Sequence, residues 1–92
     1  MNREQAELIA LQALGHVASD EKLLIEFLNI SGFTPSELHQ KAQDVEVLCG
    51  ILDFLLMSDE RVLDFAAAID IPPALTAVAR RALPGGEEVN WS

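Results

Sequence analysis

The sequence is poor in the residues on which catalytic, metal-binding and disulfide-bonded proteins rely. Its 92 residues include one cysteine, two histidines and no tyrosine. The single cysteine, Cys49, excludes an intrachain disulfide and is typical of a reducing compartment. Because its neighbours are apolar, we expect Cys49 to be a small buried side chain rather than a reactive thiol.

Aromatic residues are also scarce, at 5% of a chain that is 50% hydrophobic. The core must therefore be built from Leu, Ile, Val and Ala, and this composition favours packed helices over sheets. We predict an all-α fold, a compact bundle of five or six short helices. Residues 1–86 are expected to form a single helical domain, and residues 87–92 a flexible C-terminal tail.

Positive charge is limited as well. Fifteen acidic against six basic residues give a formal net charge of -9, a field that repels phosphate backbones and anionic membranes. The longest apolar run, residues 47–52, is far shorter than the ~20 residues needed to cross a bilayer. The N-terminal residues also lack the basic and apolar regions of a signal peptide. We therefore expect a cytoplasmic protein that binds neither nucleic acid nor membrane.

Hydrophobic periodicity and capping residues place the helices. Ser19 and Ser58 are expected to cap the second and fifth helices, with acids in the first turns. Thr34 to Glu37 has the pattern of a capping box with Pro35 at the first helical position, and Asp44 is expected to cap the fourth helix. The first and fourth helices are apolar around more than half of their circumference, so we expect both to be central. The expected helices span residues 4–18, 20–30, 35–43, 45–57, 59–69 and 74–83.

Two stretches of the chain resemble each other. Residues 19–35 read SDEKLLIEFLNISGFTP, and residues 58–73 read SDERVLDFAAAIDIPP. Aligned from their Ser-Asp-Glu starts with one deletion, both contain a cap, an acidic turn, an aromatic anchor and a Pro-initiated second helix. A helical hairpin cannot bury its apolar side alone, so we expect two related hairpins around the two central helices. Duplication and convergence on good capping chemistry both account for the likeness.

No group of residues points to catalysis. His16 and His39, the only imidazoles, do not have the spacing of a metal motif. Glu46 and Asp53 lie along one predicted helix with Gly50 between them, and we expect a solvated seam there. An alternative is that Gly50 admits a partner helix with the two acids at its rim. We predict no catalytic, cofactor-binding or metal-binding residues.

Apolar residues in the two predicted bends and in the tail are the best candidates for a contact surface: Phe33, Pro35, Ile71 and Trp91. Alternatively, bend residues fasten the start of the following helix to the core. The leading prediction for function is a small, non-enzymatic protein-interaction module with an unidentified protein partner. The wide apolar arcs of the first and fourth helices also predict a homodimer.

Two other classes of function remain as alternatives. One is a small-ligand-binding protein or enzyme with a pocket between helices that uses Glu46, Asp53 and His16. The other is a helix-turn-helix-like nucleic-acid binder, because residues 32–42 have the short glycine bend and capped second helix of that motif. Lys41 is the only cation in that segment, and the net charge of -9 disfavours this alternative.

Several segments resemble a known family. These are the FL-x-x-x-GFTPSEL pattern of residues 27–38, ILDFLLMSDERVLDF at residues 51–65, and IPPALTAVARRALPGG at residues 71–86 with a tryptophan in the tail. They are similar to a small uncharacterised bacterial family, mainly alphaproteobacterial, known as a domain of unknown function. The resemblance runs from Ala6 to Trp91 and rests on turn and packing residues. It implies an all-helical fold and no assigned activity, so it transfers no site residue.

Overall fold

A computed structural model describes residues 1–84, and these residues form six helices and no strand. The all-α fold is therefore confirmed for this part of the chain. The tail predicted at residues 87–92, including Trp91, lies outside the described residues. The helices are α1 (Arg3–Ala18), α2 (Glu21–Ser31), α3 (Pro35–Gln40), α4 (Val45–Leu56), α5 (Asp59–Ile69) and α6 (Ala74–Arg81).

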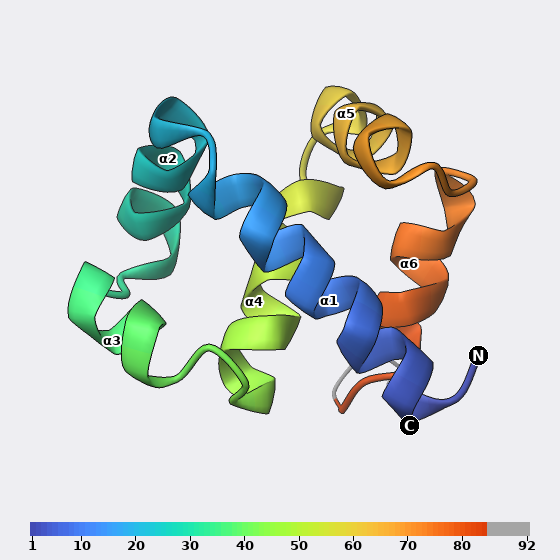
Figure 1. The fold of residues 1–92 in the computed structure, drawn as a ribbon, viewed down its shortest axis with the longest axis horizontal. Coiled ribbons are helices and arrows are strands. Elements are labelled where there is room, and N and C mark those ends of the chain that lie inside the picture. Colours follow the sequence, from blue (N-terminus) through green and yellow to red (C-terminus); the bar gives the residue numbers. More distant parts are fainter. Residues whose placement is uncertain (85–92) are drawn as a thin grey trace.

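Helices α1 and α4 form the centre of the bundle, as predicted. They make the most extensive contact between any two helices, and each of them also packs against α2, α5 and α6. Figure 1 shows α1 crossing in front of α4, with α2 and α3 to one side of the crossing and α5 and α6 to the other. Every outer helix except α3 is thus held by both central helices.

The core is made of small side chains on α1 and larger ones on α4. Ala6, Ala10, Ala13 and Val17 of α1 have no exposed surface. The α4 side chains that fill the space between the helices are Val47, Leu48, Ile51, Leu52, Phe54 and Leu55. Burying an aliphatic side chain of this size contributes about 1.5–3 kcal/mol, so this layer supplies much of the driving force for folding.

Three side chains that the sequence pattern places inward are exposed instead. Leu8 of α1 is 60% exposed, Ile30 of α2 is 53% exposed and Leu63 of α5 is 55% exposed. Leu8 and Leu63 lie on the sides of their helices opposite fully buried residues, because residues two apart on a helix point in nearly opposite directions. Ile30 borders a hollow that no other side chain fills. Apolar periodicity alone overestimated how far the helices are enclosed.

The caps agree with the sequence pattern at three helices and differ at α2. The side chains of Thr34, Asp44 and Ser58 accept hydrogen bonds at the starts of α3, α4 and α5. At α2 the cap is Asp20, whose carboxylate accepts from the Leu23 N–H at 3.2 Å. Ser19 has helical backbone angles at the end of α1 and its hydroxyl donates to the His16 carbonyl. It cannot take the extended conformation that an N-cap requires, so the prediction for Ser19 was wrong.

The corrected cap changes how the two similar stretches align. Asp20 and Ser58 are the equivalent caps, and Gly32 and Asp70 are the equivalent left-handed residues that end α2 and α5, each 11 residues long. Asp20 and Ser58 lie the same number of residues apart as Gly32 and Asp70 do. The two stretches therefore align without a deletion. The same order, a central helix followed by an 11-residue helix and a short one, describes α1–α3 and α4–α6. The two predicted hairpins are therefore α2–α3 and α5–α6, and each follows one of the two central helices.

This equivalence predicts that glycine is favoured at both left-handed positions, so that introducing it at position 70 and removing it at position 32 have opposite effects on stability. Asp70 has φ 58° and Gly32 has φ 82°, a region that favours glycine over residues with a Cβ atom. We expect Asp70→Gly to raise the free energy of unfolding by about 0.5–1 kcal/mol, and Gly32→Ala to lower it by about 1 kcal/mol. Urea denaturation measures both variants. Destabilisation by Asp70→Gly would contradict the assignment.

Candidate functional site

The bend between α2 and α3 is held in one conformation by local hydrogen bonds. Gly32 closes α2, and its N–H donates to the Leu28 carbonyl. Thr34 and Glu37 form a capping box, in which the Glu37 N–H donates to Thr34 Oγ1 at 3.1 Å and the Thr34 N–H donates to Glu37 Oε1 at 3.0 Å. The Phe33 N–H donates to Ser31 Oγ at 3.2 Å. These bonds fix the positions of the bend residues between the two helices.

One side of the bend borders an apolar hollow between α2 and α4, which we call the aromatic hollow. Its volume is about 290 Å³. The Phe27 ring lies 5.4 Å from the Phe54 ring and 6.1 Å from the Phe33 ring, centroid to centroid. Two lining residues, Ile30 and Met57, are 53% and 63% exposed. The lining residues are Phe27, Ile30, Ser31, Phe33, Glu46, Gly50, Asp53, Phe54 and Met57.

Gly50 lies under the Phe33 ring in this hollow. A Cβ atom at position 50 would stand 3.7 Å from Phe33 Cε2, an ordinary contact distance. The aromatic side chain of the bend therefore lies on one side of the glycine, and Gly50 itself is half-buried.

The other side of the bend borders a second hollow, between α1, α2 and α3, with a volume of about 270 Å³. We call it the α1–α3 hollow. His39 is the only polar side chain that lines it. Its lining residues are Leu14, Ala18, Leu24, Leu28, Pro35, Leu38, His39 and Ala42. Phe33 and Pro35, two residues apart, thus line two different hollows.

The two acids of the aromatic hollow are in different electrostatic situations. Asp53 Oδ1 accepts a hydrogen bond from Arg80 Nε at 2.6 Å, and this bond raises the pKa of Arg80 above its usual value. Arg80 Nη1 also donates to the Pro84 carbonyl at 3.1 Å. Glu46 has no ion-pair partner within residues 1–84. The face of α4 that was expected to be solvated is thus ion-paired with α6 at Asp53 and has no such pairing at Glu46.

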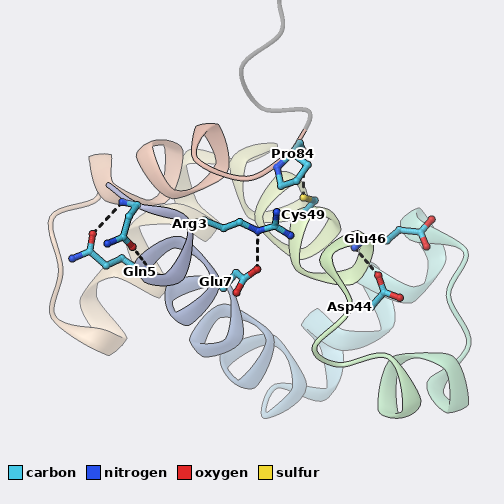
Figure 2. Close-up of polar contacts among 8 residues, drawn as sticks. Arg3, Gln5, Glu7, Asp44, Glu46, Cys49 and Pro84 are labelled. Carbon is cyan, nitrogen blue, oxygen red and sulfur yellow. Dashed lines mark hydrogen bonds and ion pairs between the residues drawn. The ribbon is translucent and has the colours of Figure 1, made fainter.

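Figure 2 shows the Glu46 carboxylate extending away from the α4 ribbon while the backbone at this position is bonded to Asp44. The Glu46 N–H donates to Asp44 Oδ1 at 3.0 Å, which is the cap of α4. Because this bond uses only the backbone of Glu46, its carboxylate remains exposed to solvent. An exposed carboxylate beside an apolar hollow can pair with a cation brought by a partner.

The remaining candidates lie elsewhere. Ile71 is half-buried at the bend between α5 and α6 and packs on the core, as Phe33 does at its own bend, but it lines neither hollow. Trp91 lies outside the described residues. The His16 ring packs 5.5 Å from the Phe65 ring and does not line the aromatic hollow with Glu46 and Asp53. The structure therefore does not assemble the three residues of the alternative enzyme pocket.

Cys49 is half-buried rather than fully buried. Its Sγ lies 3.6 Å from the Pro84 carbonyl oxygen, to which the thiol donates (Figure 2). Desolvation raises the pKa of the thiol, so the protonated form is favoured at neutral pH. Cys49 packs against the core, but it is less buried than the sequence-based interpretation expected.

Two exposed residues of the aromatic hollow were not among the sequence-based candidates. By helical spacing in the sequence, Ile30 falls on the inward face of its helix, and Met57 falls on the stripe that holds Glu46, Gly50 and Asp53. Met57 could have been identified as a candidate from the sequence, because it is a large apolar residue on the side of its helix opposite the core. The exposure of Ile30 could not be predicted from the sequence, because the hollow beside it depends on how α2 and α4 approach each other.

Within the described part of the chain, no group of three or more His, Cys, Asp or Glu side chains is arranged to hold a metal ion. No single helix there has the length and apolar composition of a membrane span. Helices α5 and α6 meet that test only when taken together, and they are bent by 97° at their junction.

Residues 1–84 thus form a small all-α bundle with an apolar hollow on each side of one bend. A family model described as "Protein of unknown function (DUF3572)" matches residues 3–86. This match covers most of the chain, and the chain belongs to that family, which confirms the resemblance to a family of unknown function. No curated protein and no solved structure matches the chain. Function therefore has to be argued from the site itself.

The capping box at the bend predicts a specific pH dependence of stability. The pKa of Glu37 is lowered because hydrogen bonds from Thr34 stabilise the Glu37 carboxylate. The bond from the Thr34 backbone N–H has the larger effect, and the Thr34 hydroxyl has the smaller one. A carboxyl whose pKa is lower in the folded state contributes stability above its unfolded pKa, and this contribution is lost as the pH falls through the folded pKa.

Wild type should therefore be more stable than Glu37→Gln at neutral pH, and the difference should shrink as the pH falls below about 4.5. Urea denaturation at a series of pH values measures it. The neighbouring Ser36→Ala serves as a control that leaves the pH profile unchanged. A difference between wild type and Glu37→Gln that stays constant with pH would contradict the prediction.

Proposed function

We propose that the chain is a small, non-enzymatic protein-interaction module that binds an apolar segment of a partner protein in the aromatic hollow. The observation that carries the proposal is the exposure of Ile30 and Met57 beside a hollow of about 290 Å³ walled by phenylalanine rings. Large exposed apolar side chains grouped around a concavity are typical of protein-binding surfaces. Methionine adds adaptability, because its unbranched side chain adjusts to different partners.

A partner segment suits the hollow better than a small molecule does. Small-molecule sites usually enclose about 300–1,000 Å³ and combine an apolar lining with a few convergent polar groups. The aromatic hollow and the α1–α3 hollow, at about 290 and 270 Å³, lie at the lower limit of this range, so the chemistry of the lining decides rather than the volume. The Asp53 carboxylate is also engaged by Arg80, which leaves no pair of carboxylates available for acid and base catalysis.

The helix-turn-helix alternative is weaker for reasons of length and charge. Helix α3, which would have to read a DNA groove, has six residues. Lys41 is the only lysine or arginine in residues 32–42, and the net charge of -9 opposes binding to phosphates. The proposed module acts on protein, and we propose the cytoplasm as its location, on the composition described above.

A second copy of the chain is one candidate partner, and the homodimer stays a prediction. The wide apolar arcs that motivated it are largely buried within one chain, because α1 and α4 pack on each other and on three outer helices. A dimer would therefore have to use exposed residues such as Met57. Light scattering after gel filtration decides between a single chain of 10.0 kDa and twice that mass.

The proposal predicts position-dependent capture of a partner. A photo-crosslinking amino acid replaces Met57 in one variant and Leu63 in another, two apolar residues that are similarly exposed, at 63% and 55%. Only Met57 lines the hollow. In lysate of the native organism, we expect discrete crosslinked protein bands from position 57 and not from position 63.

The position-57 bands should disappear when Ile30→Asp is added to the same chain, because a carboxylate at the edge of the hollow disfavours burial of an apolar segment. Circular dichroism confirms that each variant is folded. Identical crosslinking patterns at positions 57 and 63 would remove the aromatic hollow as the binding site.

A further inference from the structure

We infer that the segment bound in the aromatic hollow carries a basic residue next to its apolar anchor, and that Glu46 recognises this residue. The inference rests on the proposed function and goes further by stating the chemistry of the partner. It follows from the distribution of charge around the hollow.

The charges that line the hollow are all negative. Its lining contains the two acids Glu46 and Asp53 and no lysine or arginine. Arg80 already pairs with Asp53 at 2.6 Å, so the chain neutralises one of the two charges internally. Glu46 has no such partner among the residues that the structure describes. A bound segment therefore meets one unpaired negative charge at the rim.

The geometry of α4 fixes where this charge stands relative to the apolar surface. Glu46 lies one helical turn before Gly50, over which the Phe33 ring packs. Met57 is three turns from Glu46, about 16 Å along the helix axis. A segment laid along α4 can thus bury an apolar side chain against Phe33 and Met57 while a cation one turn away reaches Glu46. Helical segments with apolar anchors at such spacings commonly bind grooves of this type.

Charge also determines which segments are excluded. The chain carries fifteen acids against six bases, and three of those bases, Arg3, Arg61 and Arg80, form internal ion pairs. An acidic segment would be repelled both by the overall field and by Glu46. A basic segment is steered toward the hollow and gains a pairing at its rim. Complementarity therefore favours an apolar, basic partner.

Selection from a library of random short peptides tests the inference, with the immobilised full-length chain as the target. We expect the enriched peptides to combine Phe, Leu or Trp with Lys or Arg close by. The best peptide is then synthesised with a fluorescent label, and its dissociation constant is measured by anisotropy against wild type and variants at low salt. The variants are Glu46→Gln, Glu60→Gln and Met57→Asp.

Glu46→Gln should weaken binding by about 1.5-fold to fivefold at low salt, the range expected for a solvent-exposed ion pair, and the loss should shrink at high salt. Glu60→Gln is a matched control, because Glu60 is also an exposed acid in the first turn of its helix. It should bind as wild type does. Met57→Asp should abolish binding, and circular dichroism and urea denaturation verify that all three variants are folded.

The outcomes separate the inference from the proposed function. Enrichment of neutral or acidic peptides, or equal affinity of a peptide for wild type and Glu46→Gln, would overturn the inference of a basic partner. If the affinity still depends on Met57, the aromatic hollow remains the binding site. Peptides that bind Met57→Asp as tightly as wild type overturn the proposed function. A selection that enriches no peptide contradicts the proposed function and with it the inference.

Discussion

The packing of α1 against α4 is the constraint on which the rest of the structure depends. Ala6, Ala10 and Ala13 have no exposed surface, so a larger side chain at any of them would have to displace a neighbouring helix. Overpacking of this kind typically costs about 1–3 kcal/mol. The two central helices can approach closely because three of the buried residues of α1 are alanine.

Because the chain is short, the outer helices are incompletely covered. Phe27 and Phe65 anchor α2 and α5 by a single buried face, and Arg61 strengthens the attachment of α5. Its guanidinium stacks 4.0 Å from the centre of the Phe54 ring and donates to the Phe54 carbonyl at 3.1 Å. It also lies 3.6 Å from the carboxylate of Glu26 on α2. Hollows remain where α2 and the following bend do not close onto their neighbours, and the proposed function is assigned to one of them, the aromatic hollow.

Features of the fold that depend on local chemistry could be predicted from the sequence. Thr34 and Glu37 form the expected capping box because both partners lie within one helical turn. At Ser19 the prediction failed because Asp20 is an equally good cap and the last turn of α1 occupies the serine. The burial of Thr76, whose hydroxyl has no hydrogen-bond partner within residues 1–84, also depends on tertiary packing that periodicity does not reveal.

The candidate site was only partly predictable for a related reason. Phe33 and Pro35 could be singled out because they are apolar residues in a predicted bend. The pairing of Asp53 with Arg80 joins residues of two different helices, and the hollow lined by Ile30 and Met57 arises between two helices. Neither has a signature in local spacing, so both emerge only when α2, α4 and α6 are placed around the core.

Native-state hydrogen exchange measured by NMR tests the central role of the α1–α4 contact most directly. If that contact holds the bundle together, the amide protons near Ala10 and Ala13 of α1 and near Ile51 and Leu52 of α4 should exchange most slowly. They should exchange only through global unfolding, whereas amides of the short α3 should exchange through local opening. Amides of α1 that exchange as rapidly as those of α3, while α5 or α6 stays protected, would contradict this account.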